Sequence, residues 1–236
     1  MPSTPSTPRV LVVLAHPDDP EFFCGGTLAL WAEQGSWIGY CLLTRGDKGD
    51  AHGSDPAGLA ATRELEQRAA AQVLGVAEVT FLNYPDGYLV PDLDLRREVV
   101  RAIRKLKPTV VVTCDPTNFF PNDRYINHPD HRAAGQATLD AVFPAAGSRM
   151  FFPELLGDGL EPHKVSQVYV AMPQTPNTVI DVTAMFERKV EALRRHASQI
   201  ADPEALLLRL KDRMLDPSAP PESPRYVERF RRIDLA

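Results

Sequence analysis

The chain has 236 residues, of which 44% are hydrophobic and 24% are charged, a composition typical of a folded protein with one sizeable core. Its formal net charge of −5 gives no electrostatic footprint for nucleic acid, and no apolar run approaches the roughly 20 residues that cross a bilayer. We therefore expect neither nucleic acid nor a membrane as a partner.

The N-terminal segment 1–8 contains Pro and Ser but no apolar core behind a basic start, so it predicts a flexible leader and not a secretory signal. A cytoplasmic location follows by default. The three cysteines, Cys24, Cys41 and Cys114, are odd in number and widely spaced, so they suggest neither a disulfide framework nor a cysteine-rich zinc site. We expect them to be buried thiols.

Strands and helices are expected to alternate along the chain. The apolar run at 10–15 predicts a first strand, which stops at His16-Pro17-Asp18-Asp19 and is followed, through a glycine pair, by a helix-favouring segment. Later apolar or β-branched runs predict strands, and segments of strong helix formers predict helices. The strands are expected at 37–44, 79–82, 109–114, 167–171 and 178–182, and the helices at 57–74, from 92 or 94 to about 107, 129–143 and 184–200.

This alternation predicts an α/β fold, a single domain with a doubly wound, mostly parallel, Rossmann-like sheet. Such sheets bind ligands beyond the carboxyl ends of their strands. The first turn lacks G-x-G-x-x-G, so dinucleotide binding loses its main support. The first four strands each end in a polar segment, so we expect the site at that rim, formed by HPDD, RGDKGD, NYPDG and DPTNFFPNDRYINHPDH.

Two clusters of histidine and aspartate supply metal-ligand candidates. In the first, His16 and Asp19 can converge on one ion across a tight turn, while Asp18 can face a bound water. In the second, His128 and His131 have the same i, i+3 spacing at a helix start, where the intervening Asp can orient an imidazole. A catalytic zinc usually takes three protein ligands and keeps a fourth position for water, so the sequence predicts a metal site.

Each cluster alone has a simpler explanation. A His-Pro-Asp sequence at a strand end is more often a capped turn than a ligand set, because Asp and Pro form turns for backbone reasons. The two clusters together, at the ends of the first and fourth strands, favour a metal. The remaining candidates have structural or solvent-exposed interpretations: His52, His163 and His196, Arg63 as a surface arginine, and Asp86 as a turn former.

Two motifs carry a resemblance to a known family, AHPDDPEFFCGGTLA at 15–29 and HPDHRAAGQATLDAVF at 128–143. Through them the chain resembles the zinc-dependent N-acetylglucosaminyl deacetylases of the LmbE-like (PIG-L) family. The resemblance covers residues 9–200, which we expect to form the deacetylase domain, and leaves 201–236 as a C-terminal tail that packs on it. One departure is Pro20, which stands where the family usually has Glu.

The resemblance implies one Zn²⁺ per chain, held by His16, Asp19 and His131. It also implies that Asp18 is the general base. The acid of the family motif is displaced to Glu21 by the intervening proline, and no function is assigned to it.

The resemblance further implies that His128, hydrogen-bonded to Asp130, is the second catalytic group. Arg63 and Asp86 match positions that contact the sugar in relatives. Tyr125 lies near a position where some members use a tyrosine to polarise the substrate carbonyl.

The expected activity is hydrolysis of the acetamide of a small N-acetylglucosamine-type sugar conjugate. Two alternatives stay open: a non-catalytic sugar-binding member of the fold, and a metal-dependent hydrolase of another amide or ester. Relatives act on several conjugates and range from monomers to hexamers, so the sequence leaves the conjugate and a homo-oligomeric state open.

Overall fold

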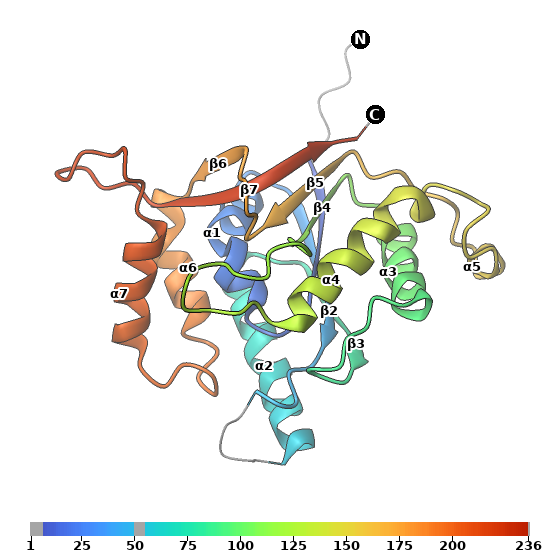
Figure 1. Ribbon diagram of the computed structural model, residues 1–236, viewed down its shortest axis with the longest axis horizontal. Coiled ribbons are helices and arrows are strands. Elements are labelled where there is room, and N and C mark those ends of the chain that lie inside the picture. Colours follow the sequence, from blue (N-terminus) through green and yellow to red (C-terminus); the bar gives the residue numbers. More distant parts are fainter. Residues whose placement is uncertain (1–6, 50–54, 236) are drawn as a thin grey trace, which may run out of the picture.

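Within residues 7–49 and 55–235, which the computed structural model describes, seven strands form one sheet in the order β3-β2-β1-β4-β5-β7-β6 (Figure 1). The first five strands of this order are parallel, and β7 runs antiparallel to both of its neighbours. The strands are β1 Arg9–Leu14, β2 Trp37–Thr44, β3 Glu78–Tyr84, β4 Val110–Cys114, β5 Gln167–Ala171, β6 Thr178–Asp181 and β7 Val227–Asp234.

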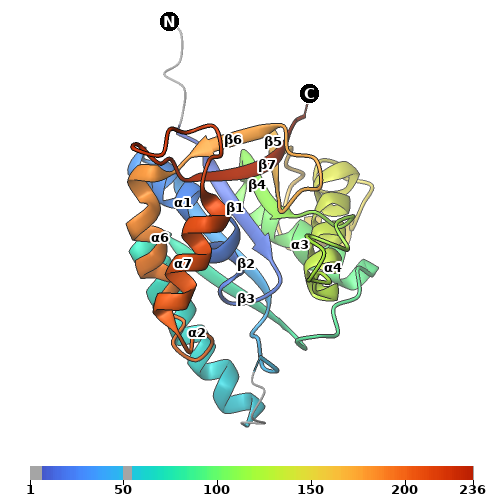
Figure 2. The ribbon, with the colours of Figure 1, turned by 60° about the vertical axis from the view of Figure 1, so that its left-hand side comes forward.

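Helices cover both faces of this sheet (Figures 1 and 2). On one face lie α3 and α4, and on the other lie α1, α2 and α6, with α7 beside α6. None of the described helices is long and apolar enough to span a membrane. The helices are α1 Asp19–Glu33, α2 Pro56–Leu74, α3 Leu93–Leu106, α4 Pro129–Asp140, a π-helix Ala141–Ala146, α5 Glu154–Gly157, a 3₁₀ turn Thr183–Met185, α6 Phe186–Leu193 and α7 Pro203–Met214.

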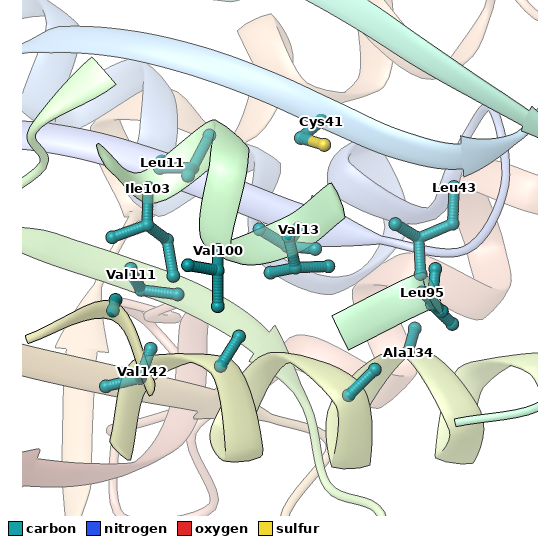
Figure 3. Close-up of a cluster of buried hydrophobic side chains, with 14 of the residues drawn as sticks. Leu11, Val13, Cys41, Leu43, Leu95, Val100, Ile103, Val111, Ala134 and Val142 are labelled. Atoms are coloured by element: carbon teal, nitrogen blue, oxygen red, sulfur yellow. The ribbon is translucent and has the colours of Figure 1, made fainter. Parts of the chain in front are cut away.

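The central strands of the sheet are buried on both faces, because every residue of β4 and all but the first residue of β1 and of β2 are buried. Burial of such β-branched and apolar strands supplies most of the driving force for folding. The three cysteines are buried and unpaired, as expected from their spacing. Figure 3 shows side chains of α3 and α4 packed against strand side chains on one face of the sheet. The helices contribute Leu95, Val100, Ile103 and Ala134, and the strands contribute Leu11, Val13, Leu43 and Val111.

The α/β fold with a mostly parallel sheet, predicted from the alternation, is confirmed. The predicted flexible leader lies largely within residues 1–6 and His52 lies within residues 50–54, and both ranges are outside the described residues. The helix expected over 184–200 ends earlier, at Leu193, because the chain turns there and buries His196. The boundary at residue 200 between domain and tail stays a prediction.

The C-terminal segment contributes α7 and also β7, a strand that the sequence analysis did not anticipate. A buried ion pair between Lys189 Nζ and Glu228 Oε1, 2.6 Å apart, ties β7 to α6. The Glu228 carboxylate accepts the backbone N–H groups of Gly26 and Thr27, and Lys189 donates to the carbonyl of Phe22. The pair therefore holds β7 and α6 against the helix that follows the first motif.

Candidate active site

The two sequence motifs meet at the carboxyl ends of β1 and β4. These strands are parallel neighbours, so the segments that follow them leave the sheet at the same edge. His16 lies in the turn after β1, and His131 lies in the first turn of α4, stiffened by Pro129 at the helix start. His16 Nδ1 and His131 Nε2 are 3.3 Å apart although 115 positions separate the residues.

The side chains of His16, Asp19 and His131 are in mutual contact. His131 Nε2 lies 3.0 Å from Asp19 Oδ1, and His16 Nδ1 lies 3.4 Å from Asp19 Oδ2. Two atoms bound to one zinc ion at about 2.1 Å and a tetrahedral angle are about 3.4 Å apart. The spacing of these three donor groups therefore fits a single zinc-sized ion, and all three side chains are buried.

The far nitrogen of each imidazole has a hydrogen-bonding partner of its own. His131 Nδ1 lies 3.0 Å from the amide oxygen of Asn127, which leaves Nε2 directed at Asp19. His16 Nε2 lies 3.0 Å from Asp86 Oδ1 and 3.3 Å from Asp130 Oδ2. Such contacts fix the orientation and tautomer of metal-binding imidazoles.

Burial and neighbouring charges both shift the pKa values of His16 and Asp19. Burial lowers the pKa of His16. Hydrogen bonds to Asp130, Asp19 and Asp86 raise this pKa by more than burial lowers it, so the pKa of His16 is well above its usual value. Burial raises the pKa of Asp19, whereas His131 and His16 lower it more, so Asp19 is ionised. An ionised carboxylate among imidazoles is the charge arrangement that a divalent cation prefers.

Two further groupings of side chains bring donor atoms together around His16. One combines it with His128 and His131, and the other with Asp86 and Asp130. Both share His16, so the neighbourhood of that imidazole is the metal-binding candidate among the described residues. The carboxylate of Asp19 favours the grouping with His131, because it adds a charged ligand to two imidazoles.

Asp18 lies beside this cluster in a left-handed backbone conformation, with φ of 88°. Its backbone N–H donates to Gln67 Oε1 at 2.8 Å, and its carboxylate accepts Arg63 Nη2 at 3.1 Å. Burial raises the pKa of Asp18 to about 6, although the Arg63 charge opposes the rise. A carboxylate with such a pKa can accept a proton near neutral pH.

His128 is half-buried and its ring stands edge-on to His16, with centroids 4.6 Å apart. Burial and the charges of His16 and His131 lower its pKa. The contact expected between His128 and Asp130 is present in a different form: the Asp130 backbone N–H donates to His128 Nδ1 at 3.2 Å. The Asp130 carboxylate instead faces His16 and accepts the N–H groups of Gly87 and Leu89.

Arg63 is not the surface arginine that its position on a helix suggested, because it is only 3% exposed. Its guanidinium donates to the carbonyls of Pro17 and Gly46 as well as to Asp18. A Cβ at Gly46, whose φ is +67°, would lie 2.2 Å from Arg63 Nη1, so this position of the loop requires glycine. Arg63 therefore links the loop after β2 to the first motif.

The sequence analysis missed a buried polar network behind Asp18. Glu21, left without a function, is fully buried and accepts Gln67 Nε2 at 3.0 Å and Tyr40 Oη at 3.3 Å. His196 Nε2 lies 3.2 Å from the other side of the same carboxylate. Because Gln67 also accepts the Asp18 N–H, the network reaches the backbone of the candidate base. These residues come from separate segments, so no local pattern could reveal the network.

A cleft of about 1460 Å³ opens onto the cluster. Asp18, Arg63, Asp86 and His128 line it together with the three candidate ligands, and Tyr125 lies on its wall, 46% exposed. The cleft thus brings together seven of the eight site residues predicted from sequence. The eighth, Asp130, lies behind His16 and is fully buried.

Comparison with known proteins agrees with this arrangement. The sequence profile of the PIG-L family, described as GlcNAc-PI de-N-acetylase, matches residues 11–142, which include the first motif and all but the last residue of the second. The chain belongs to the PIG-L family. The match spans β1 to the end of α4 and therefore contains every candidate site residue.

Individual PIG-L relatives cover more of the chain. A Thermococcus kodakarensis protein named diacetylchitobiose deacetylase is 35% identical over 195 residues, which are 82% of this chain and 71% of that one. A Kineococcus radiotolerans protein named 1D-myo-inositol 2-acetamido-2-deoxy-alpha-D-glucopyranoside deacetylase is 29% identical, over 93% of this chain and 77% of that one. The solved structure of N,N'-diacetylchitobiose deacetylase from Pyrococcus horikoshii has a TM-score of 0.83 at 28% identity and covers 97% of this chain and 85% of its own.

Proposed function

We propose that this protein is a zinc-dependent N-deacetylase that removes the acetyl group from an N-acetylglucosamine-type conjugate. One observation carries the proposal: donor atoms of His16, Asp19 and His131 lie 3.0–3.4 Å apart beside the carboxylate of Asp18. A set of ligands alone would serve a structural metal. A carboxylate next to it that is not itself a ligand, facing a large cleft, is what activation of a water molecule needs.

The names of the PIG-L relatives support the choice of substrate class. The Thermococcus, Kineococcus and Pyrococcus proteins are all named as deacetylases of N-acetylated glucosamine compounds. The fold alone would not support this choice of substrate class, because one α/β fold can carry enzymes of many different reactions.

The metal would be held by His16, Asp19 and His131, one ion per chain. A zinc ion bound there supplies Lewis-acid polarisation of the acetyl carbonyl and of a water molecule. The residues fit this ion because two imidazoles and one ionised carboxylate are a common ligand set for catalytic zinc. The buried partners Asn127 and Asp130 keep the two imidazoles oriented.

We assign the proton transfers of the reaction to two side chains of the protein, Asp18 and His128. Asp18 Oδ accepts a proton from the attacking water, and its pKa of about 6 keeps it largely ionised at neutral pH. His128, on the same cleft wall, stabilises the developing oxyanion when protonated and supplies a proton to the leaving amine. Asp130 fixes the start of α4, and hence His128, through its backbone N–H.

Arg63 and Asp86 are the proposed sugar contacts, since both line the cleft beside the reacting groups. Each also has a role within the protein. Arg63 holds the Asp18 carboxylate and Asp86 holds the far nitrogen of His16. Binding of sugar hydroxyls by these two residues would therefore couple substrate position to the base and to a metal ligand.

Acetate release from N,N'-diacetylchitobiose by the zinc-loaded protein tests the proposal. Asp18→Asn should retain zinc and lose about 10²–10⁴-fold in kcat, because general base catalysis contributes roughly that much. Asp140→Asn is the matched control, since that carboxylate lies on α4 and pairs with Arg96 outside the cleft. A zinc-bound Asp18→Asn protein with near-normal turnover would show that the base is wrongly assigned. No turnover on any N-acetylated glucosaminide would favour a binding protein or another hydrolase.

A further inference from the structure

The cleft extends well beyond the candidate metal centre. Its volume of about 1460 Å³ exceeds the roughly 300–1,000 Å³ typical of small-molecule sites, so it has room for more than one sugar ring. The far wall is built by α7 and β7, which come from the C-terminal segment (Figure 1). Three arginines line this wall: Arg209 and Arg213, one helical turn apart on α7, and Arg229 on β7.

These three arginines have no acidic partner. Among the residues that the structure describes, no carboxylate lies within 4.0 Å of their guanidinium nitrogens. Glu228, which precedes Arg229 in the sequence, is already bound by Lys189 and by two backbone N–H groups. Some arginines elsewhere on the surface are paired with acids, for example Arg149 with Glu161, Arg195 with Glu191 and Arg225 with Asp216.

Arg213 connects this wall to the candidate active site. Its Nη2 donates to the carbonyl of Phe22 at 3.0 Å, and Phe22 lies one turn along α1 from Asp19. The guanidinium is thus anchored by one backbone acceptor while the side chain stays exposed to the cleft, which leaves further N–H donors for a ligand.

We propose that Arg209, Arg213 and Arg229 form a subsite for an anionic group, a carboxylate or a phosphate, on the aglycone of the N-acetylglucosamine conjugate. The inference rests on the proposed function for the identity of the sugar end. Guanidinium groups recognise both anions through paired, charge-assisted hydrogen bonds. In a chain of net charge −5, three unpaired cations on one cleft wall create a local positive field that selects such substrates.

The test compares N-acetylglucosaminides, in both anomeric forms, that differ only at the end of a short alkyl aglycone. One series ends in a carboxylate, one in a phosphate monoester and one in a neutral carboxamide of similar size. The zinc-loaded protein should show at least about tenfold higher kcat/KM for one of the anionic series than for the carboxamide, since a charge-assisted hydrogen bond is worth about that factor. The better of the two anionic series identifies the anion.

The double variant Arg209→Gln/Arg213→Gln should reduce this preference to less than about threefold, whereas Arg195→Gln, on a paired surface arginine, should retain it. Arg229→Gln gives a second test if the double variant does not fold. Isothermal titration of the same glycosides measures the preference without turnover, so it separates failure of the subsite from failure of the deacetylase assignment. Equal binding and equal kcat/KM for charged and neutral aglycones would overturn the subsite.

Discussion

Arg63 Nη2 lies 3.1 Å from Asp18 Oδ2, so the candidate base is paired with a buried cation. The Arg63 charge lowers the pKa of Asp18 against the effect of burial, and the result is a pKa of about 6. Arg63→Met removes that charge, so the base should remain protonated to higher pH. The acid limb of kcat/KM should move up by about one pH unit or more, because an opposite charge at this distance shifts a carboxyl pKa by roughly 1–3 units.

The pH dependence of acetate release measures this shift, and Arg63→Lys is the control because it keeps a positive charge at the position. Circular dichroism verifies that both variants are folded. An unchanged acid limb in Arg63→Met would mean that another group controls it.

Asn127 should affect zinc affinity without contacting the ion. Its amide oxygen holds His131 Nδ1, so Asn127→Ala frees the imidazole to rotate. Loss of such a partner typically weakens metal binding by about 10–100-fold. Competition with a chromogenic chelator measures the zinc dissociation constant. Asn122→Ala, whose amide oxygen accepts the Arg124 N–H in the same loop, should bind zinc like the wild type. Equal affinities in the two variants would contradict the assigned role.

The Lys189–Glu228 pair should contribute to stability far more than surface pairs do. Glu228→Gln leaves Lys189 buried without a counter-charge, a change that typically costs about 3–5 kcal/mol in the free energy of unfolding. Glu191→Gln breaks the exposed pair with Arg195 and should cost less than about 1 kcal/mol. Urea denaturation gives both values. A loss below 1 kcal/mol in Glu228→Gln would show that the tie between β7 and α1 is dispensable.

His196 should make stability depend on pH in a defined direction. Burial lowers its pKa, but the hydrogen bond and charge of Glu21 raise it more, so the folded pKa lies above the usual 6.5. The raised pKa means that protonated His196 stabilises the fold fully below pH 6.5 and loses this effect as pH rises through the folded value. The unfolding free energy of wild type minus that of His196→Gln, measured with chelator present, should therefore be largest near pH 6 and shrink towards pH 9. A difference that grows with pH would reverse the assignment.

The candidate metal centre could be predicted from the sequence because each motif is local. His16 and Asp19 lie on one turn, and His131 lies on one helix start, so the only further requirement was that the strands before them be neighbours. A parallel doubly wound sheet places β1 and β4 side by side, as the structure shows. Two motifs and one topological rule therefore predicted a metal site here, whereas the choice of His16, Asp19 and His131 as its ligands came from the resemblance to the family.

The buried partners could not be predicted in this way. Glu21 meets Gln67 from α2 and His196 from the turn after α6, contacts that only tertiary packing creates. Four of the first six residues of β7 are charged, and for this reason the sequence did not predict that this segment is a strand between β5 and β6. Charged side chains fit there because Arg231 is exposed, Arg229 and Arg232 are half-buried, and the buried Glu228 is paired with Lys189. Arg209, Arg213 and Arg229 of the cleft wall lie on the same C-terminal segment as β7, so their position at the cleft could not be predicted either.

Zinc titration of the chelator-treated protein, with acetate release from N,N'-diacetylchitobiose as the readout, tests the central claim most directly. Turnover should be absent without metal, rise in proportion to added zinc and reach its plateau at one equivalent per chain. His131→Ala should fail to reach that plateau, because it lacks one of the three ligands. Full turnover in the metal-free protein, or zinc bound at one equivalent in His131→Ala with normal affinity, would contradict the account.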